Sequence, residues 1–468
     1  MNRPGLGWLA IVRLGLVQTA LGAIVVLTTS TINRVMVVEL ALPAMLPGFL
    51  VALHHVVQMS RPHFGHRSDV GGRRTPWIIG GMFALALGGV GAATGTAVMA
   101  TAHGLGVAIA VCSFVVIGLG VGAAGTSLLA LLAKRVDPGR RAAAATIVWI
   151  MMIAGFAITA GAAGHFLDPF SPERLVAVTA TVSAAAFLVT LLALWGVEGA
   201  AQPAPAAEGP VDEAAGDAAS PHGPARPRFG QALREVWEEA DARRFTIFVF
   251  VSMLAYSTQD LILEPYAGTV FGMTPGESTQ LAGVQHGGVL LGMLLVAITG
   301  TAARRAASGL LRWWTVGGCA ASALALAGIA YGGGQALAWP LRLNVFLLGV
   351  ANGAFAVAAI ASMMTLAGRG RSRSEGIRMG LWGGAQAIAF GLGGFLGTVA
   401  IDVSRQFLDN PVHAYAIVFS GEAALFLYAA VLGMTVRLAT SDKTSDNTDD
   451  RPAPTFGDVA MAEVLQGR

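Results

Sequence analysis

The chain has 468 residues, of which 54% are hydrophobic and only 12% are charged, and its formal net charge is +3. A soluble domain carries about 25% charged residues, so this composition excludes an ordinary water-soluble globular protein. The apolar runs recur along nearly the whole chain and are too long for barrel strands, so an all-α polytopic membrane protein is predicted.

Twelve stretches of about 20 mostly apolar residues are each long enough to cross a bilayer. The predicted spans are 8–30, 43–61, 76–99, 105–133, 142–166, 174–197, 245–267, 278–301, 311–332, 341–366, 377–401 and 412–436. The first span has no small-residue cleavage site, so no cleavable signal peptide is predicted. The spans divide six and six, which predicts an N-terminal bundle over 1–197 and a C-terminal bundle over 244–437.

Arginine and lysine residues are concentrated in every second loop between these spans. The alternate loops and their helix ends carry only Arg34, Arg174, Arg342 and Arg405. Because cytoplasmic loops are enriched in these residues, both termini and the central loop are predicted to be cytoplasmic. A missed or additional span would break the alternation, so the alternation also supports the count of twelve. We interpret the small positive charge as an orientation signal, and no nucleic-acid partner is predicted.

Polar residues interrupt the first two spans. The stretch "STINRVMVVE" places Asn33, Arg34 and Glu39 near the predicted periplasmic end of the first span. His54 and His55 follow about halfway along the second span. Ionisable groups within spans cost about 2.5–3.5 kcal/mol each on insertion scales and usually face the bundle interior or water. These residues are therefore candidates for a functional site.

The loop between the second and third spans reads "GHRSDVGGRRTPW" and fits the pattern G-x-x-x-D-x-x-G-R-[RK] of the major facilitator superfamily. The matching residues are Gly65, Asp69, Gly72, Arg73 and Arg74. Glycines permit a tight turn, and the acid can pair with the arginines or cap a neighbouring helix. We therefore predict a latch between helices on the cytoplasmic side. The matching loop of the second half keeps Arg304 and Arg305 but lacks the acid.

The two halves are joined by residues 198–243. The first part is rich in Ala, Pro and Gly and is predicted to be disordered. Its last part, "FGQALREVWEEADARR", has helical spacing with Phe229, Leu233 and Trp237 on one side. Two interpretations remain open, a helix on the cytoplasmic membrane surface or a solvated linker helix. Residues 438–468 are polar and are predicted to form a disordered cytoplasmic tail.

The seventh span contains the most unusual stretch, with Gln259, Asp260 and Glu264 near its predicted periplasmic end. Parallel repeats place these residues at a depth similar to that of Arg34 in the first span. We hypothesise that Arg34 pairs with Asp260 or Glu264 and closes the periplasmic side of a central cavity. The alternative is that all three lie in water at helix ends. Pro265 predicts an end or bend of the helix directly after Glu264.

Three stretches carry a more specific resemblance, namely Thr29–Ala44, Gly65–Asp69 and Tyr256–Met293. They resemble the PucC/LhaA family, the bacteriochlorophyll delivery branch of the superfamily, and the resemblance covers essentially all twelve spans. It implies a factor of the photosynthetic inner membrane that handles bacteriochlorophyll and assists assembly of light-harvesting complexes. Light-harvesting polypeptides or a pigment synthase are the implied partners. The short loop after Asp69 favours the PucC-like paralogue encoded among bacteriochlorophyll-synthesis genes.

Under this resemblance, His286 in the eighth span is a candidate axial ligand for the magnesium of the pigment, because a neutral imidazole nitrogen can bind a metal. Gly283, Gly287 and Gly288 would let a flat macrocycle approach the helix. The same glycines suit ordinary helix packing, so both interpretations remain open. The further pigment-binding candidates are Gln285, His54 and His55. Adjacent histidines on a helix cannot both face one cavity.

The sequence contains no phosphate-binding loop, zinc spacing or nucleophile motif, so no enzymatic activity and no direct metal site are predicted. Two alternative functions remain, a secondary transporter coupled to protons through Asp260 or Glu264, and a scaffold that only binds partner helices. For Glu422 in the twelfth span, the sequence favours a snorkelling or paired side chain over a proton carrier.

Overall fold

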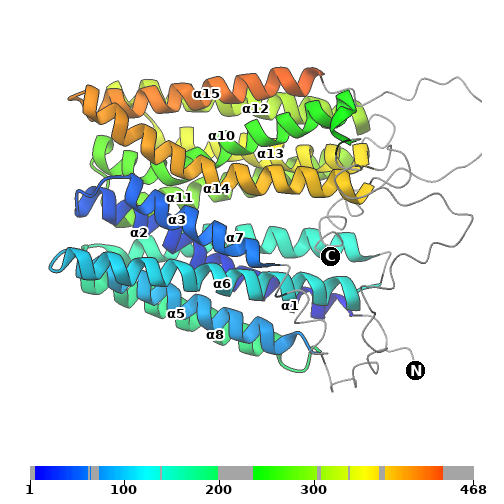
Figure 1. Ribbon diagram of the computed structural model, residues 1–468, viewed down its shortest axis with the longest axis horizontal. Coiled ribbons are helices and arrows are strands. Elements are labelled where there is room, and N and C mark those ends of the chain that lie inside the picture. The colour runs from blue at the N-terminus through cyan, green and yellow to red at the C-terminus, as the bar shows by residue number, and fades with distance from the viewer. Residues whose placement is uncertain are drawn as a thin grey trace, which may run out of the picture.

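The computed structural model describes residues 6–61, 64, 73–137, 140–198, 234, 236–302, 307–335, 338–367 and 375–435. Over these residues the chain forms helices and no strands (Figure 1). Most of the predicted linker over 198–243 (residues 199–233), the tail after residue 435, and Gly65, Asp69 and Gly72 of the loop motif lie outside the described residues.

The N-terminal half begins with one long helix that runs through α1 (Trp8–Val26), η1 (Leu27–Thr31), α2 (Ile32–Arg34) and η2 (Val35–Glu39). It continues with α3 (Met45–Val57), η3 (Gln58–Ser60), α5 (Thr75–Met99), α6 (His103–Arg135), α7 (Arg141–Leu167) and α8 (Pro172–Leu194). The C-terminal half comprises α10 (Ala240–Phe271), α11 (Pro275–Ala302), α12 (Ala307–Gly332), η6 (Gly333–Gln335), α13 (Leu341–Ala367), α14 (Glu375–Phe407) and α15 (Pro411–Thr435).

Each predicted span corresponds to one helical segment. Eleven helices of the described residues are long and apolar enough to cross a membrane, and the twelfth segment, Met45–Ser60, is a shorter apolar helix. The first helix extends to Glu39, well past the predicted end at residue 30. The predicted end or bend at Pro265 is wrong as an end, because α10 continues through this proline to Phe271. A hydropathy pattern detects only the apolar middle of a helix, so polar buried ends are missed.

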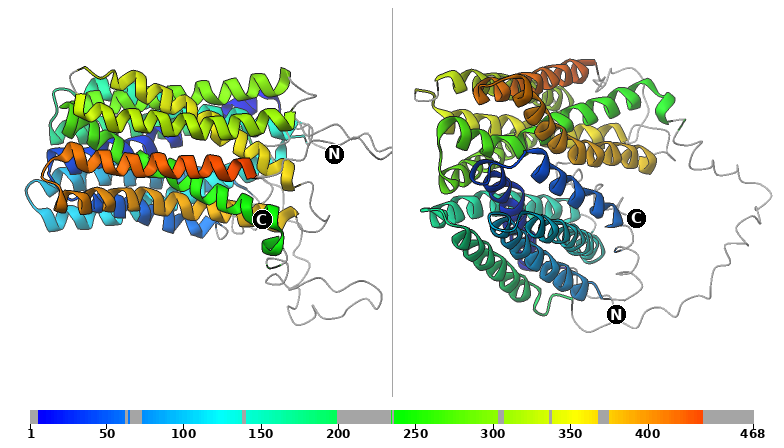
Figure 2. Two further views of the ribbon diagram at one scale, coloured as in Figure 1. Left: turned by 90° about the horizontal axis from the view of Figure 1, so that it is seen from above. Right: turned by 60° about the vertical axis from the view of Figure 1, so that its left-hand side comes forward.

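The helix contacts of one half recur in the other. In the N-terminal half α1 packs against α7 and α8, α5 packs against α6 and α8, and α3 packs against α6. In the C-terminal half α10 packs against α14 and α15, α12 packs against α13 and α15, and α11 packs against α13. Each helix of the C-terminal half thus has the same packing partners as the helix six spans earlier in the N-terminal half. The two halves lie side by side (Figures 1 and 2).

Each half has its own hydrophobic core. One cluster of buried apolar residues is formed almost entirely by the C-terminal half, and another almost entirely by the N-terminal half. The most extensive helix packing between the halves is that of α3 with α14 and of α7 with α11, and the end of the first helix also contacts α10 and α11. Because burial of apolar side chains is largely completed within each half, movement of one half against the other leaves both cores intact.

The two ends of the bundle are named here by the positive-inside prediction. Leu6 N donates to Arg135 O, and Arg135 Nη1 donates to Glu198 O, so these loop residues share one end, which we call cytoplasmic. The opposite end holds the segments that follow η2, α7, α10 and α14, and we call it periplasmic. The candidate site lies between the halves, from this periplasmic end to the middle of the bundle.

Candidate functional site between the two halves

Polar residues at the end of the first helix contact α10 and α11 of the other half. Asn33 Nδ2 donates to Leu261 O at 2.7 Å, and the hydroxyl oxygens of Thr31 and Thr279 lie 3.0 Å apart. Ser30 Oγ donates to Glu264 Oε1. The wide turn η1 is π-helical, an irregularity that is frequent at functional sites. The predicted proximity of the polar residues in the first and seventh spans is therefore observed.

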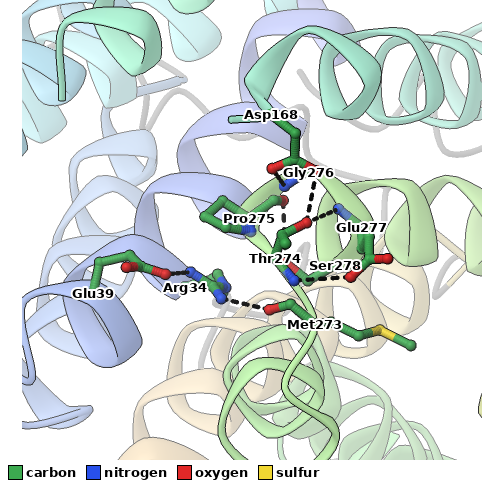
Figure 3. Close-up of polar contacts among 9 residues, drawn as sticks. All are labelled: Arg34, Glu39, Asp168, Met273, Thr274, Pro275, Gly276, Glu277 and Ser278. Atoms are coloured by element: carbon green, nitrogen blue, oxygen red, sulfur yellow. Dashed lines mark hydrogen bonds and ion pairs between the residues drawn. The ribbon is translucent and has the colours of Figure 1, made fainter. Parts of the chain in front are cut away.

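Arg34 is only 2% exposed, but its partner differs from the one we hypothesised. It forms an ion pair with Glu39, and its Nη2 donates to Met273 O at 2.7 Å (Figure 3). Glu39 follows five residues after Arg34 across η2, and a π-helical turn brings residues with this spacing together. The hypothesis that Arg34 pairs directly with Asp260 or Glu264 is wrong for this conformation.

The alternative of charges in water at helix ends is also wrong for two of the three residues. Arg34 is buried, and Glu264 is 3% exposed within the continuous helix α10. Asp260 lies one turn nearer the cytoplasmic end on the same face and is exposed, although Gln259 and Leu261 beside it are buried. That face of α10 therefore contacts the first helix at Glu264 and opens between the helices at Asp260.

A carboxylate after α7 holds the N-terminus of α11. Asp168 accepts hydrogen bonds from Thr274 Oγ1 at 2.6 Å and from Gly276 N at 3.2 Å (Figure 3). Thr274 and Glu277 form a capping box, in which each side chain accepts a hydrogen bond from the backbone N–H of the other. A Cβ at Gly276 would overlap the Asp168 side chain. The negative charge also complements the positive end of the helix dipole.

A second aspartate binds the N-terminus of a helix of the opposite half, at the junction of α3 and α14. Asp402 of α14 accepts hydrogen bonds from Ala44 N at 2.9 Å and Met45 N at 2.7 Å, at the N-terminus of α3. Since α14 corresponds to α7 and α3 to α11, the two contacts are related by the internal repeat. We call them the Asp168 latch (Asp168, Thr274, Gly276) and the Asp402 latch (Asp402, Ala44, Met45).

Sequence reasoning missed both latches. The predicted fifth and eleventh spans end at residues 166 and 401, so Asp168 and Asp402 were left in loops with the ordinary solvated acids. The signal that would have found them is their equivalent position near the C-terminal ends of repeat-related helices. An acid at one such position is uninformative, whereas a pair of acids related by the repeat predicts a shared structural role.

Contacts at the cytoplasmic end tie together helices of a single half. Glu198, which follows α8, accepts hydrogen bonds from the backbone N–H of Arg74 at 2.7 Å and of Thr75 at 2.8 Å, and so caps α5. Burial opposes ionisation of Glu198, but these hydrogen bonds and the Arg73 guanidinium outweigh it, so its pKa lies below the usual glutamate value. In the C-terminal half, Arg378 pairs with Glu239.

The predicted latch of the loop motif is described only in part. Arg74 is buried, and its guanidinium donates to Ala130 O of α6, within the same half. Arg73 lies near Glu198. The carboxylate seen at the start of α5 is thus Glu198, from beyond the sixth span, a residue to which the sequence analysis assigned no role. The role of Asp69 remains a prediction.

The pattern of contacts between the halves defines the conformation. Every hydrogen bond that joins a described residue of one half to a described residue of the other lies in the periplasmic half of the bundle. These contacts are Ser30–Glu264, Thr31–Thr279, Asn33–Leu261, Arg34–Met273 and the two latches. The structure is therefore closed by polar contacts toward the predicted periplasm.

Among the pigment-binding candidates, His286 lies on α11 where this helix packs against α7. Its Nδ1 lies 2.8 Å from Ala282 O, and because a carbonyl oxygen only accepts, Nδ1 carries the hydrogen and Nε2 keeps its lone pair. The ring of Phe156 on α7 meets the imidazole edge to face, with 5.0 Å between centroids. A Cβ at Gly287 would meet open space, whereas Gly283 and Gly288 are occupied in packing against α7 and α13.

The rings of the adjacent histidines of α3 lie beside each other, with 4.1 Å between centroids, but the two residues differ in burial. His54 is buried, its Nδ1 donates to Val51 O at 2.6 Å, and its ring lies edge-on to Phe114 of α6 in the same half. His55 is partly exposed and lies toward Gly391 of α14, in the other half. Gln285 is buried. Of the three candidate histidines, His286 and His55 lie at the junctions between the halves.

Comparison with known proteins places the chain in a family. Residues 31–441 match the sequence model of the family described as PUCC protein. The chain belongs to the PUCC protein family. This PUCC protein is 53% identical over 434 residues to the bacteriochlorophyll synthase 44.5 kDa chain of Rhodobacter capsulatus, with 92% of this chain and 96% of that protein covered. It is 29% identical over 462 residues to Protein PucC of Cereibacter sphaeroides, with 92% of each covered.

Comparison with solved structures identifies the fold of this PUCC protein. A mutant of the nucleoside transporter NupG superposes with a TM-score of 0.65 at 14% identity, covering 92% of this chain and 100% of that chain. Identity this low shows the fold alone. The resemblance to the PucC/LhaA family and the major facilitator superfamily architecture are both confirmed, and the protein is a multi-pass membrane protein.

Proposed function

We propose that this PUCC protein binds bacteriochlorophyll or a late precursor of it and delivers this pigment to a protein partner. The protein would act in the bacterial inner membrane, either the cytoplasmic membrane or the intracytoplasmic photosynthetic membrane. The delivery would serve assembly of light-harvesting complexes. The partner would be a light-harvesting polypeptide or a pigment synthase. The names of two relatives support this proposal, since one is named as a chain of bacteriochlorophyll synthase and the other as PucC.

The observation that carries the proposal is the geometry of His286. The magnesium of a bound bacteriochlorophyll would accept a ligand from the protein, and the Nε2 lone pair of His286 would supply it because Nδ1 is committed to Ala282 O. The open space at Gly287 allows a flat ring to approach the helix, and Phe156 offers an aromatic contact from the other half. A cargo bound at His286, beside the junction of α7 and α11, would therefore be contacted by residues of both halves.

We infer that the protein holds and transfers pigment and does not synthesise it. The word synthase in the name of the relative leaves a role in catalysis to be tested, and the purified protein provides the test. Incubation with an unesterified pigment and an isoprenoid diphosphate should yield no esterified product unless a separate synthase is added. Product formed by the purified chain alone would overturn this inference.

The binding proposal is tested by purification in mild detergent from a pigment-producing host. The wild-type protein should carry bacteriochlorophyll, measured by near-infrared absorption per mole of protein. His286→Ala should lose most of this pigment, because the axial donor is removed. His165→Ala is the matched control, since His165 is an exposed histidine near the periplasmic end of α7 and should retain wild-type pigment.

Two outcomes count against the proposal. Wild-type pigment content in His286→Ala, with size-exclusion profiles unchanged, would refute the ligand role of this histidine. Absence of pigment from every variant, including the wild type, would refute pigment handling itself. The alternative functions would then be favoured, with proton-dependent uptake into vesicles indicating a transporter, and co-purifying membrane polypeptides without pigment indicating a scaffold.

A further inference from the structure

Glu422 lies at the centre of α15, in the middle of a span. Its side chain is 2% exposed, and neither carboxylate oxygen has a hydrogen-bond partner among the described residues. Buried polar groups in proteins are nearly always paired, so an unpaired carboxyl group requires an explanation. The sequence favoured a snorkelling or paired side chain, and in this structure Glu422 is neither.

The side chain faces a second unpaired group on α10. Gln259 is completely buried, and neither its amide nitrogen nor its amide oxygen has a partner within the described part of the chain. The Glu422 carboxyl group lies beside the backbone of Gln259 and near enough to Asp260 to interact with it electrostatically. The Glu422 carboxyl group, the Asp260 carboxyl group and the backbone of Gln259 therefore lie near one another where α10 packs against α15.

The charge around Glu422 offers no compensation for an ionised carboxylate. An unpaired charge in the middle of a span costs several kcal/mol. The helices packed against α15 carry these titratable groups: Asp241, Arg243, Arg244, Tyr256, Asp260, Glu264 and Tyr266 on α10, Arg312, Cys319 and Tyr331 on α12, and Glu375, Arg378, Asp402 and Arg405 on α14. The arginines lie near the ends of these helices. At mid-depth this set contains no cation, so the neutral, protonated form of Glu422 is favoured.

We propose that Glu422, Gln259 and Asp260 form a proton-binding site in the C-terminal half. Glu422 holds the proton, the Gln259 amide hydrogen-bonds to the carboxyl group directly or through a buried water, and Asp260 connects the site to the opening between the helices. On release, the O–H bond of Glu422 breaks as one forms on the Asp260 carboxylate, which then gives the proton to water. No other reactant is required.

The position of the site on α10 links the proton to the contacts between the halves. Leu261 and Glu264 of the same helix bind Asn33 and Ser30 within two turns of Gln259. A change in charge at Asp260, or at Glu422 beside Gln259, therefore acts on the helix that carries these contacts. The proposal is independent of pigment binding and holds whatever cargo the protein carries.

The experiment is infrared spectroscopy of the purified full-length protein in lipid nanodiscs at neutral pH. A protonated carboxyl group gives a C=O stretching band that shifts in deuterated buffer. The wild type should show this band, and Glu422→Gln should lose it, since the amide keeps the shape of the side chain but cannot hold the acid proton. Glu277→Gln, at the exposed start of α11, is the matched control and should keep the band.

Two further variants make the result decisive. Glu264→Gln tests the other buried acid of α10, and loss of the whole band in this variant but not in Glu422→Gln would overturn the assignment. Asp260→Asn should keep the band but slow its shift in deuterated buffer, because the route to water is interrupted. Absence of the band in the wild type would contradict the proton-binding site. A shift in deuterated buffer that is as fast in Asp260→Asn as in the wild type would contradict the route through Asp260.

Discussion

The periplasmic and cytoplasmic ends of the molecule are held by different kinds of contact. At the periplasmic end, two aspartates and the end of the first helix join one half to the other. At the cytoplasmic end, Glu198 and the Arg378–Glu239 pair each join helices within a half.

This difference separates two properties of the protein. Contacts between the halves set the population of the closed conformation, and contacts within a half set the stability of that half. Because each half has its own core, the first kind can break without the second. Substitutions at the two ends should therefore give different signatures, which the following predictions examine in order of decreasing effect.

Charge reversal at Arg34 should have the largest effect. Arg34→Glu places a buried negative charge beside Glu39 and near Glu264, and we expect a loss of about 3–5 kcal/mol, as for other broken buried ion pairs. The free energy of unfolding in mixed micelles measures this loss. Adding Glu39→Arg should restore part of it, whereas adding Asp260→Arg should not. Equal rescue by both second substitutions would contradict the assignment of Glu39 as the partner.

Removal of both latches should open the periplasmic end without unfolding either half. In the double variant Asp168→Ala/Asp402→Ala, loss of each latch should destabilise the closed conformation by about 1–3 kcal/mol. Each latch consists of two hydrogen bonds to a charged group that is partly exposed. Hydrogen–deuterium exchange should rise over residues 40–46 and 272–278. Glu173→Ala, an exposed acid at the same end, is the control. Unchanged exchange in the double variant would show that the latches do not hold the closed conformation.

Substitution of the cytoplasmic cap should have the smallest effect and a different signature. Glu198→Ala should lower stability by about 1 kcal/mol, as expected for loss of a helix cap, and should leave exchange at the periplasmic end unchanged. A rise in periplasmic exchange in this variant would contradict the separation of the two ends.

The same variant has a defined dependence on pH. Since the pKa of Glu198 is lower in the folded protein than in the unfolded chain, its contribution is complete above the usual glutamate pKa of about 4.3. The contribution is lost as the pH falls through the lower, folded-state value. The difference in unfolding free energy between wild type and Glu198→Ala should therefore shrink on acidification, and a difference that grows would contradict the direction of the shift.

Prediction from sequence succeeded where the determining forces are local. The twelve spans follow from runs of apolar residues, and their direction follows from the arginines of alternate loops, so both could be stated before any contact was known. The proximity of Asn33 and Arg34 to the seventh span was also accessible, because the internal repeat fixes the depth of both helices, whereas Ser30 was not singled out. The family resemblance rested on quoted stretches and was confirmed over most of the chain.

The partners of individual charged groups were not accessible in the same way. Three acids, Glu39, Asp260 and Glu264, lie at a depth in the membrane similar to that of Arg34. The π-helical turn that brings Glu39 to Arg34 has no clear signature in the sequence. Asp168 and Asp402 looked like loop acids until the start of a distant helix was placed beside each of them. Glu422 was predicted to be snorkelling or paired, and only the structure shows it buried and without a partner, close to Gln259.

By itself, then, the amino-acid order determined a twelve-span membrane protein with two repeated halves and costly polar side chains near the periplasmic ends of two related helices. Hydrophobic length and charge asymmetry decide these features, and both are summed over neighbouring residues. Only the tertiary structure decided which carboxylate meets which donor, because a hydrogen bond needs its atoms within about 3 Å. At that distance the rotation and register of helices far apart in the chain become decisive.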